Sequence, residues 1–101
     1  MEKVFRTTKG LAARLNQFFK ENRKIQIEQT MLEEGKLIVT YEKQKKCLTT
    51  RRKFKRQYMA VELGKKWETG EEYAYESRFQ LILISEFLSK EVHVAIYRIL
   101  E

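Results

Sequence analysis

The stretch KIQIEQTMLEEGKLIVTYEK, residues 24–43, contains two runs of alternating apolar and polar residues with a turn signal between them. Ile25 and Ile27 alternate with polar side chains in the first run, as Leu37 and Val39 do in the second. A period of two is typical of a strand with one buried face. Gly35 can take the positive φ that a tight turn needs, so the stretch predicts a β-hairpin.

The residues before the hairpin predict a short strand followed by a helix. Residues 3–6 form an apolar run that suits an edge strand, and Thr7 and Thr8 are candidate N-caps. Four apolar side chains then recur at helical spacing: Leu11, Leu15, Phe18 and Phe19. A helix is therefore expected over residues 9–22, with Asn22 at its C-terminal end.

Residues 44–67 fit two structures. A helix over 50–63 is the preferred interpretation, because Thr49 and Thr50 offer a cap and Gly64 a stop. The competing interpretation is a strand, because apolar and polar residues also alternate over 57–63.

The remaining residues predict a helix and a final strand. Thr69 and Glu72 have the spacing of a capping box, and an apolar face follows, so a helix is expected over 71–89. A strand through residues 79–83 is the alternative. Residues 92–97 are β-branched and apolar on both faces, which favours a central, covered strand.

Taken in order, these elements predict a fold. The chain has 101 residues, which suits a single α+β domain over residues 1–101. The element order matches a ferredoxin-like βαββαβ arrangement, an antiparallel sheet with two or three helices on one face. No family motif or internal repeat is recognisable.

The composition argues against an enzyme. The chain has no aspartate, one histidine and one cysteine, too few groups for a metal site or an intrachain disulfide. His93 and Cys47 have more ordinary structural explanations than catalytic ones, and so do the glutamate pairs at 33–34 and 71–72. We therefore expect a non-enzymatic protein without cofactor, metal or small-molecule substrate.

Residues 1–15 lack the apolar core of a signal peptide, and no apolar run is long enough to span a membrane. These features predict a cytoplasmic protein without stable membrane insertion. A homo-oligomer is possible, because exposed strand edges can pair.

Most of the positive charge lies in residues 43–66, which we call the basic strip. The net charge of the chain is +7, but the strip alone has ten Lys or Arg side chains and a single Glu. Such local asymmetry favours an anionic partner. The predicted nucleic-acid-binding residues are Lys45, Lys46, Arg51, Arg52, Lys53, Lys55, Arg56, Tyr58, Lys65, Lys66 and Trp67.

Three other interpretations of the basic strip stay open. It can be a solvated basic face of a helix that packs Phe54 and Tyr58 inward, or a membrane-surface helix. The main rival to nucleic acid is an acidic protein surface, bound by an adaptor or inhibitor that uses Tyr41, Trp67 or Tyr73 as anchors.

Overall fold

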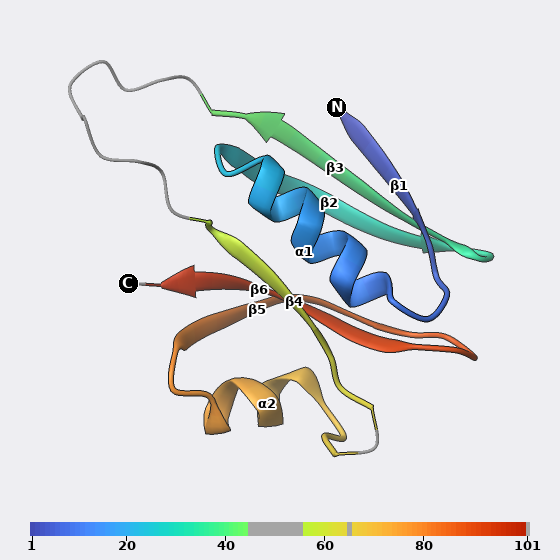
Figure 1. The fold of residues 1–101 in the computed structure, drawn as a ribbon, viewed down its shortest axis with the longest axis vertical. Coiled ribbons are helices and arrows are strands. Elements are labelled where there is room, and N and C mark those ends of the chain that lie inside the picture. The colour runs from blue at the N-terminus through green and yellow to red at the C-terminus, as the bar shows by residue number, and fades with distance from the viewer. Residues whose placement is uncertain (45–55, 65, 101) are drawn as a thin grey trace.

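The computed structural model describes residues 1–44, 56–64 and 66–100 of the chain. Its elements are β1 (Glu2–Arg6), α1 (Leu11–Glu21), β2 (Ile25–Glu33), β3 (Lys36–Lys43), β4 (Tyr58–Glu62), α2 (Gly70–Glu76), β5 (Gln80–Leu88) and β6 (His93–Leu100). Two antiparallel sheets result: the first sheet has the order β1-β3-β2 and the second sheet β4-β6-β5. Figure 1 shows four layers along the longest axis: the first sheet, α1, the second sheet and α2.

The N-terminal expectations are largely confirmed. The short strand, the helix and the hairpin all form, and Gly35 in the hairpin turn has a φ of 72°. Asn22 ends α1, where its backbone N–H and its side-chain Nδ2 each donate to the Phe18 carbonyl at 2.9 Å. The final strand is central in the second sheet, as its two apolar faces indicate.

The start of α1 differs from the expectation, because neither Thr7 nor Thr8 caps it. Gly10 is the N-cap residue, with a φ of 87°. The Arg14 guanidinium reaches back over the turn before the helix, where it donates to the Arg6 carbonyl at 2.8 Å and to Thr8 Oγ1 at 2.9 Å. A charged side chain thus ties β1 to the helix in place of a hydroxyl cap.

The helix expected over 50–63 is wrong in the part that the structure describes. Tyr58–Glu62 form strand β4, and residues 45–55 lie outside the described residues. Tyr58 and Ala60 are buried against α1, while Met59 and Val61 pack on the opposite face of the sheet. Side chains of β4 therefore alternate between two covered faces of the second sheet, as the competing strand interpretation expects.

The helix expected over 71–89 is also wrong in its length. α2 ends at Glu76, and β5 occupies the rest of the segment, as in the alternative interpretation. Pairing with β6 overrides the helical pattern, because it satisfies the backbone of β5 along its length. The capping box is half formed: Thr69 Oγ1 accepts from the Glu72 N–H at 3.1 Å, but the Glu72 carboxylate accepts from Glu68 N.

The ferredoxin-like order is not confirmed. A small α+β domain forms, but its six strands divide between two sheets, and its helices lie on opposite faces of the second sheet. α1 fills the space between the sheets. Its Phe18 ring packs 5.2 Å from Tyr41 of the first sheet, and the adjacent Phe19 ring packs 5.7 Å from Tyr58 of the second.

The two halves of the chain form the same βαββ unit, although the sequence shows no repeat. In each unit the third strand lies between the first and the second. Adding 56 to the residue numbers of the first hairpin gives the register of the second, so that Ile27↔Tyr41 corresponds to Leu83↔Tyr97. A register shift follows Ile27 and, at the same place, Leu83. Register depends on alternation and not on residue identity, which is why the repeat is hidden.

Asn16 joins the units through the open edge of β4. Its Nδ2 donates to the Ala60 carbonyl at 2.7 Å, and its Oδ1 accepts from the Ala60 N–H at 2.8 Å. The side-chain amide therefore binds this exposed edge as a neighbouring strand would.

Replacing this amide should weaken the whole fold. For Asn16→Ala we expect the free energy of unfolding to fall by about 1 to 3 kcal/mol, because both Ala60 backbone groups lose their partner. The neighbouring Gln17→Ala is the matched control, since Gln17 bonds only to Glu21 within the same helix. Urea unfolding measures both variants, and equal losses would contradict this role of Asn16.

Candidate nucleic-acid interface

The structure describes four of the eleven predicted binding residues. Lys45, Lys46, Arg51, Arg52, Lys53, Lys55 and Lys65 lie outside the described residues. Arg56 and Lys66 are exposed, and Trp67 is half-buried. Tyr58 is only 4 % exposed, and its hydroxyl accepts from the Ile27 N–H at 3.1 Å. The Tyr58 ring therefore packs between the two units and is not available at the surface for stacking.

Strand β4 separates the two ends of the basic strip. Arg56 precedes β4 and Lys66 follows it, so about 17 Å of extended chain lies between them. The described cations of the strip therefore do not form a single patch. The end that includes Lys43 and Arg56 lies near the C-terminal end of α1 (Figure 1).

At that end the structure forms a pocket of about 640 Å³, which we call the basic pocket. Four cationic residues line it: Lys20, Arg23, Lys24 and Lys43. Its single acidic residue, Glu21, accepts a hydrogen bond from Gln17 at 2.6 Å. The lining therefore has more cationic than acidic side chains.

Backbone contacts hold the basic pocket together. The Gln44 N–H donates to the Lys24 carbonyl at 2.7 Å, which fixes the end of β3 beside the turn after α1. Gln57 Nε2 donates to Gln44 Oε1 at 3.3 Å, which holds the start of β4 there too. Gln44 and Gln57 are thus joined beside this pocket.

Lys20, Arg23 and Lys24 were not among the predicted binding residues. Their signal was present as three cations in the five residues KENRK at 20–24. It was overlooked because Lys20 also has an ordinary explanation, as a cation in the last turn of a helix, where it complements the helix dipole. Only the fold shows that Lys43 joins them.

A groove of about 720 Å³ adjoins the basic pocket along β1 and α1. Lys3, Arg6 and Arg14 line it, and it shares Glu21 with the basic pocket. The cationic surface therefore continues along this side of α1.

The outer face of the first sheet has a different character. Glu28 lies at the register shift of β2, and hydrogen bonding with Glu42 raises the pKa of its carboxyl. Two neighbouring carboxyl groups make this face unfavourable for an anion. The surface around the basic pocket is therefore the better candidate interface.

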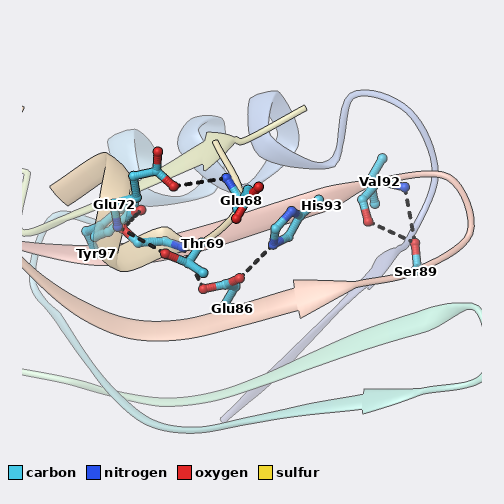
Figure 2. A network of polar contacts seen from close by, with 9 residues as sticks. Glu68, Thr69, Glu72, Glu86, Ser89, Val92, His93 and Tyr97 are labelled. Atoms are coloured by element: carbon cyan, nitrogen blue, oxygen red, sulfur yellow. Dashed lines mark hydrogen bonds and ion pairs between the residues drawn. The ribbon is translucent and has the colours of Figure 1, made fainter. Parts of the chain in front are cut away.

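A network of polar side chains beneath α2 is the second candidate for a functional site (Figure 2). Glu86 Oε2 lies 2.6 Å from His93 Nε2, and Glu86 Oε1 accepts from the Gly70 N–H at 2.7 Å. The Tyr97 hydroxyl donates to the Gly70 carbonyl at 2.6 Å, and burial raises its pKa to about 12. These groups hold the first residue of α2 on the second sheet, which agrees with the structural explanation of His93.

The hydroxyl groups of this network are all engaged with backbone. Thr69 Oγ1 accepts from the Glu72 N–H, and Ser89 Oγ accepts from the Val92 N–H at 3.2 Å. Thr69 therefore caps α2, Tyr97 anchors it on the second sheet, and Ser89 holds the turn between β5 and β6.

Glu86 should make stability depend on pH below its ordinary pKa of 4.5. Burial favours its neutral form, but the hydrogen bonds from His93 and Gly70 outweigh burial and lower the pKa of this carboxyl. Because the pKa of Glu86 is lower in the folded protein than in the unfolded chain, the ionised carboxylate stabilises the folded protein above pH 4.5. This stabilisation is lost as the pH falls through the folded pKa.

We therefore expect the free energy of unfolding to fall as the pH drops below about 4.5, and to fall less in Glu86→Gln. Glu91→Gln, at an exposed position between β5 and β6, is the control. Urea unfolding across this pH range checks the expectation, and parallel profiles for Glu86→Gln and the wild type would overturn it.

The described ranges contain no group of three or more His, Cys, Asp or Glu residues placed to hold a metal ion. Neither α1 nor α2 is long and apolar enough to cross a membrane.

Comparison with known proteins adds no relative. No family model, curated protein or solved structure matches this chain.

Proposed function

We propose that this protein binds the phosphate backbone of nucleic acid at the basic pocket. The observation that carries the proposal is the convergence of Lys20, Arg23, Lys24 and Lys43 around one pocket of about 640 Å³. Phosphate contacts of this kind position a protein on DNA or RNA without reading its sequence. A small accessory or regulatory protein without catalytic activity fits this role.

The basic strip contributes further positive charge to the chain. Six cations of the basic strip lie between Gln44 and Arg56 in the chain: Lys45, Lys46, Arg51, Arg52, Lys53 and Lys55. Like charges at this density repel one another, and a polyanion relieves the repulsion while it releases its own counterions. With about six phosphate contacts, the logarithm of the binding constant should fall with the logarithm of salt concentration at a slope near −5.

An acidic protein surface is the second candidate partner. The anchors expected for it fit less well, because Tyr41 is 8 % exposed and Trp67 and Tyr73 are half-buried. The observation in its favour is Tyr75, which is 91 % exposed on α2. Large exposed aromatic rings are typical anchors of protein interfaces.

The proposal predicts binding that depends on where the charge lies. We expect Lys20→Gln with Lys43→Gln to lower the salt slope by about 2 and to weaken binding of an oligonucleotide at least about tenfold. Lys36→Gln with Lys90→Gln removes the same charge from exposed positions in or beside the two hairpin turns. This control should bind nearly as the wild type does.

Fluorescence anisotropy with labelled single-stranded and duplex oligonucleotides, at about 50 and 200 mM salt, measures these affinities. Equal weakening in both double variants would show attraction to net charge without a site at the basic pocket. The absence of binding at the lower salt concentration would overturn the proposed function and favour an acidic protein partner.

A further inference from the structure

The repeated unit forms a surface pocket twice, at equivalent places. The basic pocket lies where α1 leads into β2, and a second pocket, of about 250 Å³, lies where α2 leads into β5. The two hairpins are 56 residues apart in the chain. With the same offset, residues 20–23 of the first pocket correspond to residues 76–79 of the second. The two units therefore present related pockets with different chemistry.

The second pocket is aromatic, and we call it the aromatic pocket. It is lined by Trp67, Tyr73, Glu76, Ser77, Arg78 and Phe79. The Trp67 and Tyr73 rings meet edge to face at 5.6 Å, and Tyr73 packs 5.6 Å from the buried Tyr97 ring. These contacts fix one wall of the pocket, while Phe79, which also lines it, is 64 % exposed.

We propose that the aromatic pocket receives an unpaired nucleobase, so that the ligand of this protein is single-stranded nucleic acid. This inference rests on the proposed function and names its ligand. Base stacking on aromatic rings is a common mode of single-strand binding, because every base presents a π-face. A base inside a duplex is already stacked and cannot enter such a pocket.

The polar groups around the aromatic pocket suit a nucleotide. Arg78 is exposed and lines the pocket, and Lys66 Nζ lies 5.2 Å from the Trp67 ring centre. Both cations can bind the phosphates that flank a stacked base. The Glu76 carboxylate is an acceptor for an exocyclic amino group, as carboxylates are for cytosine N4.

The C-terminal ends of α1 and α2, where the two pockets lie, are on the same side of the molecule, on the left in Figure 1, so a single strand that crosses the second sheet can reach both. Gln44 of the basic pocket bonds to Gln57, whose carbonyl accepts from the Ile99 N–H at 2.8 Å. Leu100 then pairs with Gln80, the residue after Phe79. The path between the pockets therefore passes from Gln44 to the start of β4, then to the end of β6 and then to the start of β5. Figure 1 shows the start of β4, the end of β6 and the start of β5 together on the left.

Packing alone does not explain this site. Trp67 and Tyr73 contribute to the core beneath α2, but Phe79 leaves most of its ring in water beside a cation. Three aromatic rings and the exposed Arg78 line this pocket together, which is the combination that single-strand binding uses.

The test uses the full chain with a single-stranded oligonucleotide and its duplex of the same sequence. We expect tighter binding of the single strand, and we expect Phe79→Ala to weaken it about 5- to 150-fold with little effect on the duplex. Tyr75→Ala is the matched control, because Tyr75 is an exposed aromatic residue of α2, four residues before Phe79, and does not line the pocket. Circular dichroism confirms that both variants fold.

Two further readouts separate this inference from the proposed function. Trp67 is the only tryptophan in the chain, so the single strand should quench the intrinsic fluorescence of the protein. Phe79→Ala should leave the salt slope unchanged, whereas the Lys20 and Lys43 double variant lowers it. Equal affinity for single strand and duplex, with Phe79→Ala behaving as Tyr75→Ala does, would overturn the inference and leave the proposed function standing. Failure of both oligonucleotides to bind would overturn the proposed function itself.

Discussion

The packing of α1 between the two sheets is the contact on which the rest of the structure depends. Phe18 and Phe19 are neighbours in the chain, but one packs on the first sheet and the other on the second. The same helix supplies Asn16, which binds the open edge of β4. A helix that is apolar over so wide an arc needs cover on both sides, and the second sheet provides the cover that the first cannot. The orientation of the two βαββ units, and thus of their pockets, follows from this helix.

The repeat explains how one kind of unit gives two different surfaces. Thr40 and Met31 lie on the outer face of the first sheet. The equivalent positions of the second sheet, 56 residues later, are Ile96 and Phe87. Ile96 and Phe87 are buried in the core with α1, whereas Met31 is exposed. The first unit therefore resembles the terminal unit of a repeat protein, whose outer face is made compatible with water. The Glu28 and Glu42 pair on that side is in keeping with an end that stays solvated.

The same divergence separates the functions that we propose for the two units. The turn after α1 has Lys20 and Arg23, which suit phosphate, and the turn after α2 has Glu76 and Phe79, which suit a base. The Glu86, His93 and Tyr97 network holds α2 in place from below. Because Trp67 packs against Tyr73 of this anchored helix, the wall of the aromatic pocket is fixed before a ligand arrives.

The sequence by itself determined the helix at 11–21, the hairpin after it, the last strand and the local excess of positive charge. These features depend on period, turn residues and composition, which are local properties. Only the tertiary structure decided that residues 58–62 and 80–88 are strands. The sequence of each segment fits both a helical and a strand period, and pairing with β6 selects the strand. Only the fold buried Tyr58, brought Lys43 to the pocket of Lys20 and Lys24, and placed Phe79 in one pocket with Trp67. Such contacts join residues far apart in the chain, and no pattern within one segment encodes them.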